Sequence, residues 1–409
     1  MKSYFDNLNT YDSNMIHLTS DGDHSFWLVS PGSIIKKRLT EYGFEIDLVE
    51  NVDAPGCYFI DVNADPQWWS GVLNDVGAPT AHIIDLIPTH IKDLVRKKLL
   101  RIVIAGDKEG GVFVTDKFDC YKSTTEAMIR SSLPAGAVLI LHGNMKAESQ
   151  YVQWLADTQS PKLFEIMYSN TFLKVFLDAN VPTEPIVNQS IVNSDAKDYN
   201  SLNRVFRPHR GAHLYKIAKD SILNNGLVSA NEIFEDTTAV KLSNGLDYYT
   251  VMSANYPKFI DGNWSNINAG PQYNIDIYKN SLISFVTETK FDEPSVFPTE
   301  KIYKPLMLGH PIILLAAAGT LEGIRSLGFK TDWCGIDSSY NDIEDDVMRL
   351  QATHEVLLDW VQLSRKEKIK RIQESMPTIE HNFNLARTSN FHKDSLQEAL
   401  NRSKRYFND

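Results

Sequence analysis

The first half of the chain alternates short apolar runs with helix-like segments. The apolar runs that we interpret as buried strands cover residues 25–30, 57–62, 99–106 and 137–143. Helix-like segments cover residues 87–98, 123–131 and 148–157. Strands that alternate with helices in this way are typical of a parallel sheet. We therefore predict an α/β domain over residues 1–185.

A second alternating region follows a polar stretch at residues 182–203, which has no sustained period and is typical of a connector. In this region strands are predicted at 202–206, 282–288 and 311–317, and helices at 213–226, 299–309, 319–329, 344–363 and 366–374. A chain of 409 residues favours two domains of roughly 200 residues each. We predict a linker at 186–200, a second Rossmann-like domain at 201–375, and a helical tail at 376–409 that packs back on the first domain.

Charge and cysteine content narrow the function classes. A net charge of −11 argues against a surface that is basic throughout, although it leaves room for one local basic cleft. The three cysteines Cys57, Cys120 and Cys334 are far apart and lack CxxC spacing, so neither a disulfide framework nor a zinc site is indicated. No apolar run is long enough for a membrane span. We expect a soluble, cytoplasmic protein in a reducing compartment.

Residues 202–219, "LNRVFRPHRGAHLYKIAK", concentrate three arginines, two lysines and two histidines in an acidic chain. Arg204, Arg207 and Arg210 recur every third residue where a strand is predicted to pass into a helix. Helix N-termini attract anions, and guanidinium groups bind phosphate oxygens in pairs. The cluster is therefore either a solvent-facing helix start or one side of an anion site.

The segment "TEKIYKPLMLGHP" contains a second helix start. Thr299 suits the N-cap and Glu300 the first turn, but Lys301 places a cation where the helix dipole disfavours it unless an anion binds nearby. Glu300 could accept hydrogen bonds from ribose hydroxyls. Glu288, at the end of the preceding strand, faces either a ligand or simply solvent.

Three segments of the chain carry a resemblance to known proteins. They are "LNRVFRPHRGAHLYKIAKDSILNNGLVS", "ISFVTETKFDEPSVFPTEKIYKPLMLGHPIILLAAAGTLEGIRSLGFKT" and "IDSSYNDIEDDVMRL". Together they resemble glycosyltransferase-like proteins of bacteriophages and other large viruses, and the TEK helix resembles the donor-binding half of α1,3-fucosyltransferases. The resemblance implies a GT-B fold, with two Rossmann-like domains facing across a cleft.

The same resemblance implies a nucleoside diphosphate sugar as the donor, with no cofactor and no metal required. Arg204, Arg207 or Arg210 would hold the diphosphate together with Lys301, and Glu300 would bind the ribose. Glu288 and Thr299 would complete the donor site. The family often has adjacent arginines, whereas Val205 and Phe206 separate the first two here, so the choice among the three arginines stays open.

A transferase that inverts the anomeric configuration of the sugar needs a base that deprotonates the acceptor hydroxyl, and this base is expected in the acceptor-side domain. Glu109, after the strand at 99–106, is our first choice, with Asp107, Asp61 and His142 as rivals. Each of these residues could instead be a loop carboxylate or a hydrogen-bonded histidine at a strand end.

The resemblance to phage proteins implies two candidate acceptors, a hydroxymethylated pyrimidine in double-stranded phage DNA and a glycan, with a hexose or a pentose as the sugar transferred. Basic runs at 36–38 and 95–101 favour DNA, whereas the charge of −11 opposes it. An enzyme of phage origin would act in the host cytoplasm. The rival hypothesis is a non-catalytic protein of the same fold that binds nucleotides or nucleic acid.

Overall fold

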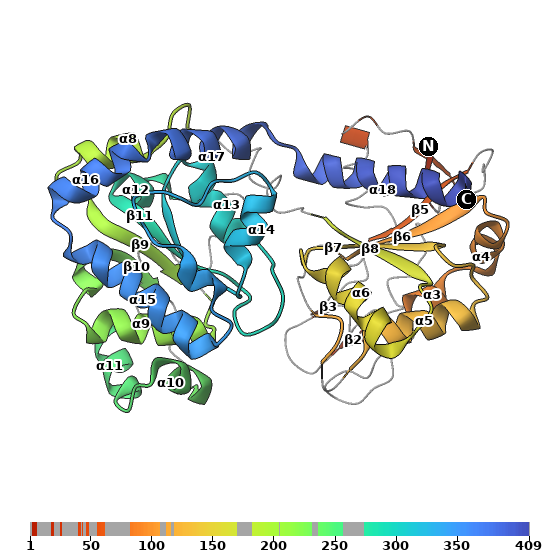
Figure 1. The fold of residues 1–409 in the computed structure, drawn as a ribbon, viewed down its shortest axis with the longest axis horizontal. Coiled ribbons are helices and arrows are strands. Elements are labelled where there is room, and N and C mark those ends of the chain that lie inside the picture. Colours follow the sequence, from red (N-terminus) through yellow and green to blue (C-terminus); the bar gives the residue numbers. More distant parts are fainter. Residues whose placement is uncertain are drawn as a thin grey trace. The chain divides into compact units, whose positions relative to one another are not determined.

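The computed structural model describes residues 2–5, 18–19, 25–26, 40–41, 43, 46–48, 55–61, 82–106, 112–115, 118–169, 182–203, 205–230, 236–256 and 274–408. The chain divides into two compact units (Figure 1). Unit 1 comprises residues 1–171 and 390–409, and unit 2 comprises residues 172–389.

Unit 1 is built on a six-stranded sheet with the order β4-β1-β5-β6-β7-β8, in which all the pairs are parallel. The strands are β1 (Lys2–Phe5), β4 (Ile46–Leu48), β5 (Gly56–Asp61), β6 (Leu100–Gly106), β7 (Val138–His142) and β8 (Phe164–Tyr168). Its helices are α3 (Ile83–Leu86), α4 (Thr89–Arg96), α5 (Cys120–Arg130), α6 (Ala147–Thr158) and α18 (Phe391–Asn408).

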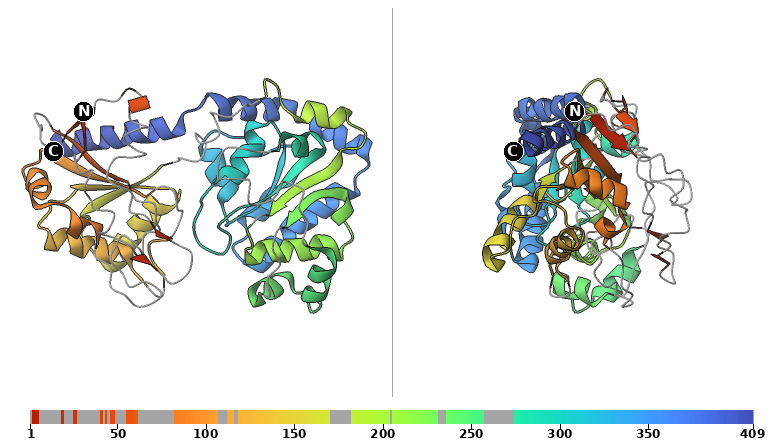
Figure 2. Two further views of the ribbon diagram at one scale, coloured as in Figure 1. Left: turned by 180° about the vertical axis from the view of Figure 1, so that it is seen from behind. Right: turned by 90° about the vertical axis from the view of Figure 1, so that its right-hand side faces the viewer.

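The two faces of this sheet bury alternate residues of the same strands. On one face Tyr58, Ile102 and Ile140 pack against α3, α4, α5 and α6. On the other face Phe59 and Leu139 belong to a cluster that includes Leu396, Ala399 and Leu400 of α18. Because successive side chains of a strand point to opposite faces, a sheet covered on both sides needs continuous apolar runs. The helices on either side of the sheet can be followed in Figure 2.

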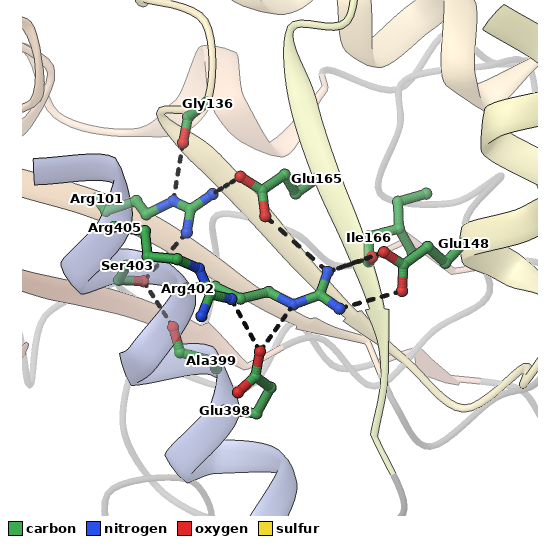
Figure 3. Close-up of polar contacts among 10 residues, drawn as sticks. All are labelled: Arg101, Gly136, Glu148, Glu165, Ile166, Glu398, Ala399, Arg402, Ser403 and Arg405. Atoms are coloured by element: carbon green, nitrogen blue, oxygen red, sulfur yellow. Dashed lines mark hydrogen bonds and ion pairs between the residues drawn. The ribbon is translucent and has the colours of Figure 1, made fainter. Parts of the chain in front are cut away.

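Helix α18 is held to unit 1 by ion pairs as well as by apolar contacts (Figure 3). Arg101 on β6 is completely buried, forms a 2.8 Å ion pair with Glu165 on β8 and donates to the Gly136 carbonyl at 2.8 Å. Arg402 on α18 forms ion pairs with Glu148 on α6 at 3.0 Å and with Glu398 at 3.3 Å. Helix α18 therefore packs in the same unit as strands β1 to β8, although about 220 residues separate it from β8 in the sequence.

Unit 2 is built on a four-stranded parallel sheet with the order β10-β9-β11-β12. Its strands are β9 (Lys197–Asn203), β10 (Gly226–Ala230), β11 (Ser281–Thr287) and β12 (Ile312–Leu315). Its α-helices are α8 (Val187–Val192), α9 (Pro208–Lys219), α10 (Thr237–Ser243), α11 (Tyr248–Asn255), α12 (Ile275–Lys279), α13 (Glu300–Met307), α14 (Thr320–Ser326), α15 (Asp346–Gln362), α16 (Arg365–Glu374) and α17 (Met376–Thr388). Short 3₁₀ turns lie at Leu223–Asn225 and Ser339–Asp342.

Each sheet reverses its strand order at one place. In unit 2 the first strand along the chain, β9, lies between β10 and β11, so the reversal falls between β9 and β11. In unit 1 it falls between β1 and β5. Open parallel sheets bind ligands beyond the carboxyl ends of their strands at such a reversal, called the switch point. The fold thus selects the ends of β9 and β11 as the place to look for a ligand site in unit 2.

The predicted fold class, α/β with two Rossmann-like domains, is confirmed by these two parallel sheets. Residues 186–200, predicted as a linker, contain α8 and the start of β9. The strand predicted at 202–206 ends at Asn203, and the following helix begins at Pro208, earlier than expected.

Other elements also differ from the prediction. Strands β8 and β10 were not expected. Ser25 and Phe26, predicted within a buried parallel strand, pair antiparallel with Leu18 and Thr19 outside the main sheet. The predicted tail at 376–409 is divided, because α17 belongs to unit 2 and α18 to unit 1. Among the described residues, no helix combines the length and apolar character needed to cross a membrane.

Candidate functional site

The switch point of unit 2 is marked by a side-chain contact between its two strands. The hydroxyl of Thr287, the last residue of β11, donates at 2.7 Å to Oδ1 of Asn203, the last residue of β9. Asn203 in turn donates to the Ser201 hydroxyl at 3.0 Å, and that hydroxyl contacts Nε2 of His213 on α9 at 3.1 Å. This buried polar chain ties both strand ends to the helix that follows β9.

Helix α9 begins next to these strand ends without a side-chain cap. Arg207 occupies the N-cap with extended backbone (φ −147°, ψ 148°), and Pro208 takes the first helical position. Proline suits that position because its missing N–H would have no helical partner there. The side chain of Arg207 is exposed. A helix start without a side-chain cap and with an exposed guanidinium is well suited to an anion.

Arg210, one turn into α9, has a different environment from Arg207. Its guanidinium donates to the backbone carbonyls of Val205 at 2.7 Å and of Thr287 and Glu288 at 3.2 Å each. Burial lowers the pKa of Arg210 to about 10, which leaves the group charged at neutral pH. Arg210 therefore joins α9 to the end of β11 and is committed to backbone carbonyls, rather than to the diphosphate contact that the sequence predicts for it. Arg204 lies outside the described residues.

His209 supports the same junction. Its Nε2 lies 2.8 Å from the Glu288 carbonyl, and its ring stacks on Phe291 with centroids 5.0 Å apart. Burial holds the pKa of His209 well below its usual value, with the neighbouring Arg210 acting in the same direction. A neutral imidazole that donates to a carbonyl is a structural contact, so His209 fixes α9 against the loop after β11.

The start of α13 gathers the other predicted donor-binding residues. Thr299 is the N-cap and accepts from the Lys301 backbone N–H at 3.3 Å. Nζ of Lys301 donates to Oγ1 of Thr289 at 3.0 Å, to Oγ1 of Thr299 at 3.3 Å and to Oε1 of Glu300 at 2.8 Å. The Glu300 carboxylate and two threonine hydroxyls therefore stabilise the ammonium within the protein, so the position of Lys301 does not by itself require a bound phosphate.

Glu300 and Lys301 are nevertheless open to solvent, with 27% and 28% of their side chains exposed. Burial raises the pKa of Glu300, but the Lys301 ammonium and then Lys304 outweigh it and hold the pKa below its usual value. The Glu300 carboxylate is therefore charged at neutral pH, and both side chains are accessible.

Glu288 is buried, with only 1% of the residue exposed. Its carboxylate accepts from the backbone N–H of Thr299 at 2.9 Å, from the Thr299 hydroxyl at 2.6 Å and from the Thr289 N–H at 3.1 Å. The direct contact with the donor that the sequence predicts for Glu288 does not fit this placement, because the carboxylate faces the protein. Nothing in the sequence pattern pairs Glu288 with Thr299.

The catalytic candidates of unit 1 follow neighbouring strands. Asp61 ends β5 and His142 ends β7, while β6 between them ends at Gly106, which pairs with His142. His142 is buried, accepts from the Asn144 N–H at 3.1 Å and packs edge-on against Phe113. This matches the alternative of a hydrogen-bonded histidine at a strand end. Glu109, Asp107 and the side chain of Asp61 lie outside the described residues.

The basic run at 95–101 is partly internal. Arg101 is buried against Glu165, and Arg96 pairs with Asp93 at 2.6 Å, which leaves Lys97 and Lys98 exposed. The run therefore offers fewer cations to DNA than the sequence indicates, and the run at 36–38 lies outside the described residues. Within the described part of the chain, no group of three or more His, Cys, Asp or Glu side chains is arranged to hold a metal ion.

No protein-family model and no curated protein matches this sequence. Among solved structures, the chain is similar to the catalytic domain of starch synthase IV from Arabidopsis thaliana bound to ADP and acarbose, with 13% identity, a TM-score of 0.40, and 92% of this chain and 76% of that one covered. It is similar to the trehalose-6-phosphate synthase OtsA, with 13% identity, a TM-score of 0.40, and coverage of 90% and 75%. It is also similar to a glycosyltransferase from Rickettsia africae, with 12% identity, a TM-score of 0.39, and coverage of 91% and 89%.

Proposed function

We propose that the chain is a glycosyltransferase that takes a sugar from a nucleoside diphosphate sugar bound to unit 2. The observation that carries the proposal is the convergence of two helix starts on one residue at the switch point. Arg210 and His209 of α9 contact the Glu288 carbonyl, and the N-cap Thr299 of α13 contacts the Glu288 carboxylate. Both helix starts present cationic side chains that are accessible, Arg207 and Lys301.

The chemistry of such a transfer requires stabilisation of a leaving diphosphate. Negative charge grows on the phosphate oxygens as the bond to the sugar breaks, and fixed N–H groups and cations stabilise it with little reorganisation. Arg207 and the first N–H groups of α9 would hold one part of the diphosphate, and Lys301 the other. Glu300 would accept from the ribose hydroxyls. In this arrangement the cations take the role of a divalent metal, so the proposed enzyme is metal-independent.

The acceptor is proposed to be a hydroxyl group activated by a base at the carboxyl edge of the unit 1 sheet. Asp61 ends β5 at this edge, and the chain that follows Gly106 carries Asp107 and Glu109. A glycan is the acceptor class that we favour over double-stranded DNA, because the burial of Arg101 removes a cation from the basic run that indicated DNA.

Calorimetric titration with UDP, GDP and ADP, followed by assays of hydrolysis and transfer with the matching sugars, tests the proposal. We expect one nucleoside diphosphate to bind. We also expect the corresponding nucleoside diphosphate sugar to be hydrolysed slowly when no acceptor is present. If none of the three binds, the donor site is refuted. Binding without any hydrolysis or transfer would instead favour a non-catalytic protein of the same fold.

A separate titration with duplex DNA that contains hydroxymethylated cytosine tests the acceptor class. Binding to DNA phosphates weakens steeply as salt rises, because counterions are released. For a glycan acceptor we expect no salt-dependent DNA binding and no transfer to DNA. Transfer of the sugar to the duplex would show that DNA is the acceptor.

A further inference from the structure

The buried carboxylate of Glu288 and the ammonium of Lys301 form hydrogen bonds to the same two threonine residues. It accepts from both the backbone N–H and the hydroxyl of Thr299 and from the backbone N–H of Thr289. Those two threonines are also the ones whose hydroxyl oxygens accept from Nζ of Lys301. Glu288 and Lys301 therefore have two hydrogen-bonding partners in common, Thr289 and Thr299.

Hydrogen-bond direction gives this sharing a physical consequence. A threonine hydroxyl has one proton, and Thr299 gives that proton to Glu288 over 2.6 Å. The lone pairs of the same oxygen are then turned towards the backbone N–H and Nζ of Lys301, each at 3.3 Å. Without an acceptor at the position of Glu288, the hydroxyl would be free to rotate, and its contact with the ammonium would no longer be fixed.

Thr289 is fixed in a similar way. Its backbone N–H bonds to Glu288, and its hydroxyl oxygen lies 3.0 Å from Nζ of Lys301. The Glu288 backbone carbonyl is meanwhile bound by His209 and Arg210 of α9. Glu288 thus fixes the position of the Lys301 ammonium at the start of α13 through its carboxylate, and it contacts the start of α9 through its carbonyl.

We infer that Glu288 is a positioning residue, whose carboxylate fixes the Lys301 ammonium through Thr289 and Thr299 and makes no contact with the donor itself. The role of Lys301 in binding phosphate rests on the proposed function. The positioning of the ammonium by Glu288 does not rest on the proposed function, so an experiment can refute either claim without refuting the other.

The change Glu288→Gln tests the positioning directly, because it keeps the shape of the side chain and places an NH₂ group where one oxygen was. Glutamine has one accepting oxygen where Glu288 has two, so either the Thr299 N–H, or the Thr289 N–H together with the Thr299 hydroxyl, loses its acceptor and faces an NH₂ group instead. The measurement is competitive acylation of lysines followed by peptide mass spectrometry, with the exposed Lys404 as the internal reference. We expect the reactivity of Lys301 relative to Lys404 to rise about tenfold, the size expected when a charge-assisted contact is lost.

An unchanged ratio in folded protein would overturn the inference, whether or not any nucleotide binds. If the glutamine variant does not fold, Thr299→Val removes the hydroxyl that links Glu288 to Lys301, and Thr299→Ser keeps it. We expect the Lys301 ratio to rise in the valine variant and to stay near the wild-type value in the serine variant. Equal ratios in the two variants would contradict the inference.

A double-mutant cycle tests the connection with the donor. The affinity for the nucleoside diphosphate that binds wild-type protein is measured for Glu288→Gln, for Lys301→Ala and for the combined variant. If Glu288 acts through Lys301, the glutamine change lowers affinity about tenfold alone and has no further effect in the Lys301→Ala background. Additive losses would show that Glu288 acts on the site by another route. Absence of binding by wild type would refute the donor site, while the acylation ratio still decides the positioning.

Discussion

The hydroxyl of Thr287 donates a 2.7 Å hydrogen bond to Oδ1 of Asn203, and this contact joins the ends of β11 and β9 at the switch point of unit 2. Thr287→Val would leave Oδ1 of Asn203 buried without that donor. We expect the free energy of unfolding to fall by about 1–3 kcal/mol, as measured by urea denaturation. Thr287→Ser keeps the hydroxyl and serves as the control. Equal stability of the valine and serine variants would contradict this account of the contact.

The two arginines of the α9 start are expected to respond differently to alanine substitution. Arg207→Ala removes an exposed cation and should weaken nucleoside diphosphate binding about tenfold with little loss of stability. Arg210→Ala removes the guanidinium that donates to three backbone carbonyls and should lower the free energy of unfolding by about 3 kcal/mol.

Calorimetry and urea denaturation measure the two effects. Lys366→Ala, which removes an exposed cation from α16, is the matched control and should change neither quantity. The assignment of roles would be reversed if Arg210→Ala were as stable as wild type while only its nucleotide binding was lost.

The buried ion pair between Arg101 on β6 and Glu165 on β8 is expected to contribute more to stability than the exposed ion pairs of α18. Glu165→Gln removes the partner of the fully buried Arg101 and should destabilise unit 1 by about 3 kcal/mol. Glu398, which is 41% exposed, should contribute less than about 1 kcal/mol when changed to glutamine. Hydrogen exchange of peptides from β6 and α18 reports on unit 1 alone, and faster exchange is expected in the first variant. Identical exchange in both variants would show that the buried pair contributes no more than an exposed one.

Buried neutral histidines predict a loss of stability in mild acid. Burial lowers the pKa of His310 to about 4 and that of His82 to about 3, and it holds the pKa of His213 well below its usual value. In unfolded chains histidine is protonated below about pH 6.5, so the unfolded state binds more protons between that pH and the folded pKa. Stability is therefore fully present above about pH 6.5 and falls by about 1.4 kcal/mol per pH unit for each such histidine below it.

Urea denaturation at about pH 7.5 and about pH 5 measures this dependence. The His310→Gln variant, which removes one of the groups, should lose stability less steeply. Burial raises the pKa of Glu288, so that carboxyl acts in the opposite direction and adds stability as it takes up a proton. Stability that stays constant between the two pH values would contradict the burial of neutral imidazoles.

The apolar strands of unit 1 could be predicted from sequence because both faces of its sheet are covered, which requires continuous apolar runs. Strand β9 could not, because its sequence "KDYNSLN" is polar. Asn200 donates to Ser281 and Ser284 of β11, and Asn203 accepts from Thr287. Polar residues can occupy this sheet because their partners lie on another strand, about eighty residues along the chain, and no local pattern reveals that pairing.

The candidate site was predictable in part. The helix start at Thr299 was located by its capping signals. Helix α9 instead begins at Pro208, before the predicted start at residue 213, although the basic cluster was expected near a helix start. The different roles of Arg207 and Arg210 depend on which side chain turns towards the carbonyls of β11. The role of Glu288 depends on its contact with Thr299. Both follow from packing between distant segments, which sequence spacing does not encode.

The central claim is that a nucleoside diphosphate binds at the carboxyl ends of β9 and β11. A crystal structure of the protein with the nucleoside diphosphate that binds in calorimetry tests it most directly. We predict phosphate oxygens within hydrogen-bonding distance of the first N–H groups of α9, of Arg207 and of Lys301, with the ribose hydroxyls on Glu300 and the Glu288 carboxylate still on Thr299. A diphosphate bound elsewhere, or one that contacts neither Arg207 nor Lys301, would contradict the account.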